Sequence, residues 1–345
     1  MNVCIVTVYN SENCGSFYQA YALKQVIEDL GHSVSFLIRD SKNSSHVRSN
    51  SFKYFFMSLL RFRFRWAFKC LQTYDDFEKA HQDFDIINES KLPEVDCIII
   101  GSDTLWNFSE KYFLDRLQVY TGGIFNGKKI TYAISVGNTT SQTLLGNKEI
   151  CNYIKAIDFI STRDRVTQEI ADSITGSKSQ IVLDPTLLLD EIDYKKCEVN
   201  IDHRDYILIY FFGDISDGMR DEIVDLKKST GKKIISYGTF RKWADINTTY
   251  NPGDFLEFFN NASYIITNTF HGCAFSIIFR KHFISLARDS QKVHDLLKSF
   301  ELQSREFKEC LKTEIIENID YDIVYKKVLQ ERHKSINFLK NSLEA

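Results

Sequence analysis

The sequence predicts an α/β protein with two Rossmann-like domains that face each other across a cleft. Two observations lead to this fold class: short apolar runs alternate with amphipathic helical patterns, and the alternation restarts in the second half of the chain. At 345 residues, each half is large enough to bury its own core. We predict a first domain over residues 1–185, a second over 186–317, and a closing helix over 318–345 that packs back on the first domain.

The first half begins with an apolar run from Val3 to Val8, a polar loop and a helical pattern that ends at Gly31. This order is how a doubly wound sheet begins, but the loop lacks the GxGxxG spacing of dinucleotide sites. Further strands of this half are predicted at 33–38, 96–101, 129–135, 159–164 and 180–183.

The second half repeats this pattern. Its strands are predicted at 206–212, 233–237, 264–267 and 283–286. Its helices are predicted over 217–229, after Asn251-Pro252, after Gly272 and over 318–342. The strands are mostly short apolar runs, as expected for parallel sheets that are covered on both faces.

Composition excludes several classes of protein. The net charge of −3 argues against broad nucleic-acid binding, which needs a basic surface. The eight cysteines form no CxxC pair, so we expect reduced packing residues in a cytoplasmic protein. We identify no signal peptide, no apolar run long enough to span a bilayer and no metal-ligand cluster, and we expect neither a metal nor a cofactor.

The stretch from Tyr264 to Phe279 is the strongest candidate for a functional site. It begins as a buried strand, breaks at Asn268-Thr269-Phe270-His271-Gly272 and continues as a helix. A strand that turns directly into a helix points free N–H groups beyond the sheet, where the helix dipole favours an anion. Gly272 lets a ligand approach the backbone, and His271 can bind an anion or move a proton near neutral pH. The alternative is a buried histidine in a tight turn.

Two more charged residues follow predicted strands. Asp103 comes after the strand at 96–101, on the side of a parallel sheet where ligands bind, although a carboxylate there can also cap the next turn. Arg163 lies at the charged end of the run at 159–164. Its guanidinium can bind a carboxylate or phosphate through two hydrogen bonds, or pair with Asp164. We favour a functional role for Arg163, and an orienting or capping role for Asp164.

Several of these motifs resemble the polysaccharide pyruvyl transferases. The similarity extends from Asn13 to about Leu297 and keeps the family's order. The matching runs are Asn13-Cys14-Gly15, Gln19-Ala20-Tyr21-Ala22-Leu23, Gly101-Ser102-Asp103 with Trp106-Asn107, Ser135-Val136-Gly137, Ser161-Thr162-Arg163-Asp164, Asp184-Pro185-Thr186 and Thr269-Phe270-His271-Gly272. The chain departs from the family pattern at Cys14, where an aromatic residue is usual, and at Lys292, which takes the place of an arginine.

This resemblance implies a GT-B-like arrangement of the two domains, with the acceptor on the first and the donor on the second. It also implies an activity, in which pyruvate moves from phosphoenolpyruvate onto a pair of sugar hydroxyls as a cyclic ketal, during synthesis of a capsule or another surface polysaccharide. Phosphoenolpyruvate would be a substrate, and no cofactor would be needed. The acceptor sugar, and whether a lipid carries it, stay open.

Residue roles follow from the chemistry and the resemblance together. Catalysis is assigned to His271, Asp103 and Arg163, with His271 binding phosphate and transferring a proton and Asp103 binding the acceptor or acting as base. Donor binding is assigned to Arg163, Thr269, His271, Gly272, Arg288 and Lys292. Acceptor binding is assigned to Asn13, Gly15, Ser102, Asp103 and Trp106. The alternatives are a helix-capping role for the loop at Asn13 and solvated surface positions for Arg288 and Lys292.

Two other functions fit the same pattern. A GT-B-type glycosyltransferase would bind a nucleotide sugar at the same helix terminus and release a nucleotide. A non-catalytic glycan-binding protein would not need His271. The polar residues at the strand ends disfavour this second alternative.

Residues 52–71 are aromatic and basic and contain no acidic residue. This composition is typical of an interfacial helix on an anionic membrane, which would bring the protein to the inner face of the cytoplasmic membrane. We prefer the alternative of a helix that packs its aromatic side chains on the core and exposes its arginines.

Overall fold

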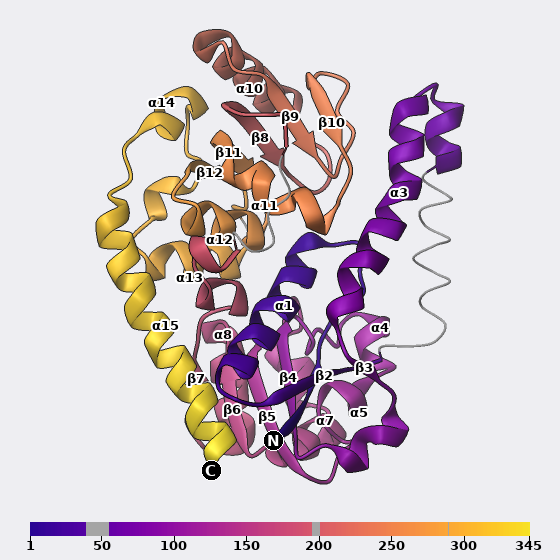
Figure 1. Cartoon of the computed structure of the whole chain (residues 1–345). Helices are drawn as coiled ribbons and strands as arrows, with labels where there is room; N and C mark the ends of the chain where they lie inside the picture. Colours follow the sequence, from indigo (N-terminus) through magenta and orange to yellow (C-terminus); the bar gives the residue numbers. More distant parts are fainter. Residues whose placement is uncertain (39–54, 195–200, 289) are drawn as a thin grey trace.

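A computed structural model describes residues 1–38, 55–194, 201–288 and 290–345 (Figure 1). Residues 52–54 of the aromatic and basic segment lie outside this part of the chain. The described residues form two parallel β-sheets, one in each half, with helices on their faces. The predicted α/β class with two Rossmann-like halves is therefore confirmed.

The first sheet has seven strands in the order β3-β2-β1-β4-β5-β6-β7, all parallel. Their bounds are β1 Asn2–Val6, β2 Ser33–Leu37, β3 Ile86–Ile87, β4 Cys97–Asp103, β5 Lys128–Ile134, β6 Phe159–Thr162 and β7 Gln180–Ile181. The strand order reverses between β1 and β4. At such a point the loops after the two neighbouring strands lead to opposite faces of the sheet and leave a crevice between them. Ligands bind in this crevice in doubly wound sheets.

Helices cover both faces of the first sheet. Val3 and Ile5 of β1 belong to one buried apolar cluster and Cys4 and Val6 to another, as the alternation of side chains along a strand requires. The helices of this half are α1 Cys14–Asp29, α3 Phe64–Ala80, α4 Lys111–Leu114, α5 Leu117–Tyr120, α6 Ser141–Leu145, α7 Lys148–Lys155 and α8 Arg165–Thr175.

The second sheet has five parallel strands in the order β10-β9-β8-β11-β12. The strands are β8 Tyr206–Tyr210, β9 Ile234–Tyr237, β10 Ile246–Thr248, β11 Ala262–Thr267 and β12 His282–Ser285. The helices are α10 Asp217–Thr230, α11 Pro252–Asn260, α12 Phe270–Ile278, α13 Gln291–Ser299 and α14 Leu311–Ile316. The order reverses between β8 and β11, so the turn from β11 into α12 again lies at a switch point.

The two halves share an aromatic core, which fixes α1 of the first domain against α11 and α12 of the second. The ring of Tyr18 in α1 lies 5.7 Å from both Phe255 and Phe275, and its hydroxyl donates to the Pro252 carbonyl at 2.6 Å. Aromatic pairs at such distances pack in preferred orientations, so they hold the relative position of the helices.

The last helix, α15 (Tyr321–Glu344), contacts both domains. The Tyr321 hydroxyl donates to backbone carbonyls at the end of α12 and before β12, and further along the helix the Ser335 hydroxyl accepts from the Leu183 N–H at 2.9 Å. Figure 1 shows this helix along one edge of the molecule, beside both sheets. The chain crosses between the sheets through the short helices η3 (Pro185–Leu188) and α9 (Glu191–Tyr194), and the boundary at residues 185 and 186 stays a prediction.

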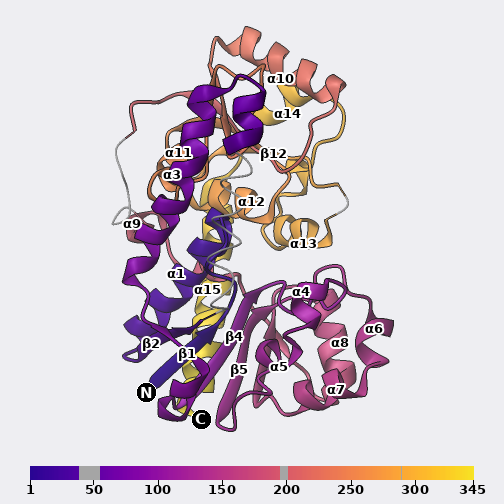
Figure 2. The same ribbon diagram turned by 90° about the vertical axis from the view of Figure 1, so that its right-hand side faces the viewer.

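The aromatic and basic segment departs from the arrangement that we preferred. Residues 55–60 are helical, and α3 then begins beside the second domain and runs back to the first domain (Figures 1 and 2). The face that packs on the second domain carries Arg63 and Trp66, which contact Phe240. Phe62, Phe64 and Phe68 are exposed instead. No helix in the described part of the chain is long and apolar enough to cross a membrane.

Candidate active site

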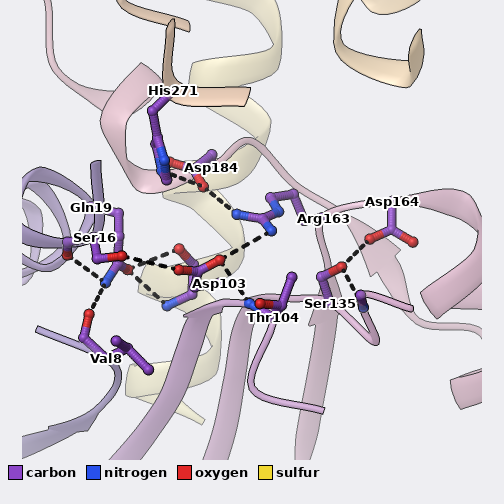
Figure 3. Close-up of polar contacts among 12 residues, drawn as sticks. Val8, Ser16, Gln19, Asp103, Thr104, Ser135, Arg163, Asp164, Asp184 and His271 are labelled. Carbon is purple, nitrogen blue, oxygen red and sulfur yellow. Dashed lines mark hydrogen bonds and ion pairs between the residues drawn. The ribbon is translucent and has the colours of Figure 1, made fainter. Parts of the chain in front are cut away.

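Three of the predicted site residues meet where the carboxyl ends of the first sheet face the second domain (Figure 3). Asp103 is the last residue of β4, Arg163 follows β6, and His271 lies in the first turn of α12. The Arg163 guanidinium donates through Nη2 to Asp103 Oδ1 at 3.4 Å. The expectation that residues from both halves converge is therefore met for these side chains.

Asp184 joins the charged groups of this cluster. Its Oδ2 accepts from Arg163 Nη1 at 2.9 Å and lies 3.9 Å from His271 Nε2. The carboxylate is fully buried, and its other oxygen accepts from the N–H and hydroxyl of Thr186. Sequence reasoning treated Asp184-Pro185-Thr186 as a domain crossing and missed this role. The sequence did contain a signal for this role, because Asp184 is a charged residue between two apolar runs and is therefore expected to be buried with a charged partner.

Two buried nitrogens of the cluster have no hydrogen-bond partner among the described residues: Arg163 Nε and His271 Nε2. Buried polar groups are nearly always paired, so two unpaired polar atoms at one place point to a ligand site or to ordered water. The side chain of Arg163 is 2% exposed and that of Asp103 is 18% exposed. Arg163 also lies against the ring of Phe270, at 4.8 Å from its centre.

The charges within the cluster shift the pKa values of its members. Burial alone would raise the pKa of Asp103, but the adjacent Arg163, together with His271 and Lys292, lowers it to about 2. Burial lowers the pKa of His271, although Asp184 and Asp103 oppose the shift. Asp103 is thus a carboxylate and a weak base, whereas His271 is neutral near pH 7 and can accept a proton.

Lys292, in the first turn of α13, belongs to the same charged group. Burial and the positive Arg163 lower the pKa of its ammonium group, while Asp103, Asp164 and Asp184 oppose that shift. Arg288 lies elsewhere. Its guanidinium donates to the Lys308 carbonyl at 3.4 Å and lies 5.3 Å from the centre of the Phe307 ring. The structure therefore groups Lys292, but not Arg288, with the predicted donor residues.

The first turns of α1 and α12 approach each other at this point. A Cβ built on Gly15 would lie 2.3 Å from Nδ1 of His271. The positive ends of two helix dipoles, from two domains, therefore meet beside the cluster and favour an anion there. Gly15 is needed because only a residue without a side chain allows this contact.

Asn13, Thr269 and Gly272 have structural roles at these helix ends. The Asn13 side chain accepts from the N–H groups of Gly15 and Ser16 and caps α1, as the capping alternative expected. Thr269 Oγ1 accepts from the Gly272 N–H at 2.8 Å and caps α12. A Cβ on Gly272 would lie 2.1 Å from Thr267 Oγ1, so close packing of the turn explains this glycine. Ligand binding by the three residues stays a prediction.

Ser102 positions the end of β4 instead of facing the site. Its N–H and hydroxyl both donate to Gln19 Oε1, and Gln19 Nε2 donates to Thr7 Oγ1 at 3.0 Å. This buried amide ties α1 to β1 and β4, and sequence reasoning did not assign it a role. Ser16, which was also missed, donates from Oγ to Asp103 Oδ2 at 3.4 Å.

Trp106 does not line the cluster. Its side chain is fully buried in the apolar core of the first domain, and its indole N–H donates to the Tyr120 carbonyl at 3.0 Å. The predicted contact with an acceptor is corrected to a packing role. Asp164 caps α8 by accepting from the Thr167 N–H, and it also accepts from the Ser135 hydroxyl at 2.6 Å, in agreement with the orienting role that we favoured.

Known structures share this fold. The UDP-GlcNAc 2-epimerase from Neisseria meningitidis bound to UDP-GlcNAc is similar over 99% of this chain and 99% of its own, with a TM-score of 0.54 and 11% identity. The Methanocaldococcus jannaschii UDP-GlcNAc 2-epimerase in complex with UDP-GlcNAc and UDP is similar over 96% of this chain and 94% of its own, with a TM-score of 0.51 and 12% identity. An α-glucosyltransferase in complex with UDP is similar over 98% of this chain and 95% of its own, with a TM-score of 0.50 and 11% identity. These are GT-B enzymes, so the GT-B arrangement is confirmed.

No curated protein matches the sequence. The sequence profile of one family, described as polysaccharide pyruvyl transferase, matches residues 13–290, which include every residue of the charged cluster except Lys292. That match covers most of the chain and every strand of both sheets except β1. On this evidence the chain belongs to the polysaccharide pyruvyl transferase family.

Proposed function

We propose that the protein transfers pyruvate from phosphoenolpyruvate to a pair of sugar hydroxyls, as a cyclic ketal, in the synthesis of a surface polysaccharide such as a capsule. Family membership supports pyruvyl transfer onto a polysaccharide. The observation that supports phosphoenolpyruvate as donor is the convergence of Arg163 and Lys292 with the first turns of α1 and α12 at His271. We place the reaction in the cytoplasm, where phosphoenolpyruvate is made.

The donor carries a carboxylate and a phosphate, and the cluster offers groups of the matching kind. Asp184 holds one side of the Arg163 guanidinium at 2.9 Å, whereas the contact to Asp103 on the other side is longer, at 3.4 Å. An anionic group of the donor would compete with Asp103 for that side. Lys292 would bind the second anionic group as a point charge. The positive ends of the α1 and α12 dipoles would favour that group electrostatically, although the Gly15, Ser16 and Gly272 N–H groups are already capped.

The proton chemistry favours His271 as base. A hydroxyl must lose a proton as it attacks, and efficient transfer needs a base whose pKa is near the working pH. Burial lowers the pKa of His271 from its usual 6.5, so its imidazole is neutral and can accept a proton, whereas Asp103, with a pKa of about 2, is a weak base. We therefore assign Asp103 to holding Arg163 and contacting the acceptor. A lowered pKa also suits Lys292 as the acid that protonates the enol carbon.

The atoms of the reaction balance without a redox partner. Protonation of the enol methylene carbon converts it to a methyl group and leaves the central carbon electron-poor. One sugar oxygen bonds to that carbon, and its proton passes to the base. The bond between the central carbon and the phosphate oxygen breaks and phosphate leaves. The second sugar oxygen then bonds to the central carbon, which closes the ketal, and its proton passes to the released phosphate.

Phosphate release tests the proposal. The protein is incubated with phosphoenolpyruvate and a panel of methyl hexopyranosides that carry free hydroxyls at positions 4 and 6. We expect release that depends on an acceptor and is abolished in His271→Ala, but not in His333→Ala on the exposed face of α15. Thermal shift with phosphoenolpyruvate against UDP-GlcNAc separates pyruvyl transfer from the glycosyltransferase alternative, since only a bound ligand stabilises the fold. Stabilisation by UDP-GlcNAc alone would contradict the proposal.

Lys292 and Arg288 provide a second, internal comparison. Lys292→Met should raise the KM for phosphoenolpyruvate at least tenfold and also lower kcat, because it removes both the charge and the proposed acid. Lys292→Arg should restore part of the loss in KM because the charge returns, but not the loss in kcat, since a guanidinium does not release its proton. Arg288→Met should leave KM within about twofold, since that side chain contacts Phe307 and Lys308. Equal losses in both methionine variants would place the donor elsewhere.

A further inference from the structure

The projecting end of α3 and the short helix before it expose an unusual group of side chains. Six large apolar side chains within residues 56–68 are between 38% and 83% exposed. They are Phe56, Met57, Leu60, Phe62, Phe64 and Phe68. We call this surface the aromatic tip. A soluble protein rarely leaves so many neighbouring apolar groups in water unless a partner covers them.

The aromatic tip is built as one surface. Phe55 packs against Phe56 at 5.3 Å and against Phe68 at 5.8 Å, which joins the short helix to α3. Phe62, in the turn between them, lies 6.3 Å from Phe64, the first residue of α3. The opposite face of α3 is already occupied, since Trp66 packs on Phe240. The second domain thus holds α3 from behind while the aromatic tip faces outward.

The charge at the aromatic tip has one sign. Arg61, Arg63, Arg65 and Lys69 lie between Phe55 and Tyr74, and this stretch contains no acidic residue, although the whole chain carries a net charge of −3. Arg61 and Arg65 are exposed next to the phenylalanines. Exposed aromatic rings flanked by arginines match the interface of an anionic bilayer, where rings enter the headgroup region and guanidinium groups bind phosphates.

A cavity of about 600 Å³ opens between the inner side of this helical pair and the second domain. Arg61, Arg63 and Trp66 line one wall, and Phe212 and Tyr250 line the other. Glu12, which precedes the cap of α1, also borders it. A ligand that is anchored in a membrane would therefore meet this cavity next to the surface on which the aromatic tip rests.

We propose that the aromatic tip is a docking surface for anionic membranes, through which the protein binds a bilayer peripherally and presents the adjoining cavity to a membrane-anchored ligand. Its rings insert among the headgroups, and Arg61 and Arg65 bind lipid phosphates. Vesicle binding tests this directly. Its outcome is independent of the donor and of catalysis, so failure here and failure of pyruvyl transfer are distinguishable.

The intact protein is sedimented with vesicles of phosphatidylcholine alone and with vesicles of three parts phosphatidylcholine to one part phosphatidylglycerol. We expect binding to the anionic vesicles that weakens as salt rises. The triple variant Phe62→Ser, Phe64→Ser and Phe68→Ser should lose binding, by about tenfold for each ring that inserts. The matched control replaces three exposed apolar residues elsewhere, Ile192→Ser, Ile316→Ser and Leu329→Ser, and should bind normally.

Charge and insertion are separated by further variants. Arg61→Gln and Arg65→Gln should each weaken binding about fivefold at low salt, whereas Arg165→Gln in α8, with an exposed side chain, should not. Phe62→Trp places an indole in the aromatic tip, and brominated lipids should quench its fluorescence if the ring inserts. The proposal is overturned if the folded protein does not bind anionic vesicles, or if the control with serine at 192, 316 and 329 loses as much binding as the triple variant. It is also overturned if the protein is a dimer and the triple variant dissociates that dimer without changing vesicle binding.

Discussion

Gly15 and His271 come from different domains and touch. The Cα of Gly15, in the first turn of α1, lies so close to the imidazole that a Cβ would stand 2.3 Å from Nδ1. Side chains essentially never approach so closely, so the glycine and the histidine define one another's position. The contact brings two helix N-termini to the same place as Arg163 and Asp184, and it makes the site sensitive to a single methyl group.

Gly15→Ala should therefore displace His271 and reduce turnover about hundredfold, because shifts near 1 Å in a catalytic group have effects of that size. The fold should persist, since alanine is acceptable in a helix. Gly218→Ala is the matched control: Gly218 lies in α10 with nothing within 4 Å of an added Cβ, and alanine there should preserve turnover and raise stability by about 0.5–1 kcal/mol. Phosphate release and thermal melts measure both. Full activity in Gly15→Ala would show that His271 does not need its present position.

Asp184→Asn should reduce the stability of the folded protein. The substitution removes the buried negative charge that lies 2.9 Å from the guanidinium of Arg163, and breaking a buried pair leaves an uncompensated charge at a cost of about 3 kcal/mol. Urea unfolding measures the stability change. In the exposed pair of Asp225 with Lys228, Asp225→Asn should change stability little, because water already screens both charges. Unchanged unfolding in Asp184→Asn would mean that the pair contributes nothing.

The meeting of Asp103, Arg163 and His271 could be predicted from sequence for a physical reason. Parallel strands of one sheet end at the same edge, so polar residues at the ends of β4 and β6 were expected on one side of the first sheet. His271 follows β11 of the second sheet, and the GT-B-like arrangement implied by the family resemblance placed that strand end across the cleft. The short apolar runs that end in polar residues made these strands easy to identify. The helix after Gly272 followed from the change in apolar spacing from that of a strand to that of a helix.

Other features could not be read from the sequence. Trp106 was assigned to the acceptor because its motif stands beside Asp103, but the turn after β4 sends the side chain into the core. Arg288 was assigned to the donor from its charge and the family resemblance, yet its partners Phe307 and Lys308 come from a later segment. The exposed face of α3 depends on the second domain, which covers the side with Trp66. In each case contacts with distant segments of the chain determine where the side chain lies, and the local sequence pattern does not encode those contacts.

Turnover should depend on pH through His271. Burial holds its pKa below the usual 6.5, so the neutral, proton-accepting form persists below that value. We expect kcat/KM to be level at neutral pH and to fall with unit slope only at a pH lower than 6.5. Stability should fall in the same direction, because the unfolded chain takes up the proton first as the pH drops. Turnover against pH and melts of the His271→Gln variant measure the two effects. A falling limb above 6.5 would contradict the assignment of the base.

Asp254 should make stability depend on pH in the opposite direction. Its carboxyl accepts from the Tyr237 hydroxyl at 2.8 Å in the contact zone of the domains, and burial raises its pKa to about 7. A raised carboxyl pKa means that the folded protein holds this proton more tightly than the unfolded chain. The stabilising effect is present at acidic pH and is lost as the pH rises through about 7.

The variant Asp254→Asn cannot ionise, and its amide oxygen can still accept from Tyr237. Above pH 7 its free energy of unfolding should therefore exceed that of the natural protein by roughly a few kcal/mol. This difference should shrink as the pH falls. Urea unfolding of both proteins across this pH range measures the effect. A constant difference at all pH values would show that Asp254 is already ionised in the folded protein, in which case burial does not control its charge.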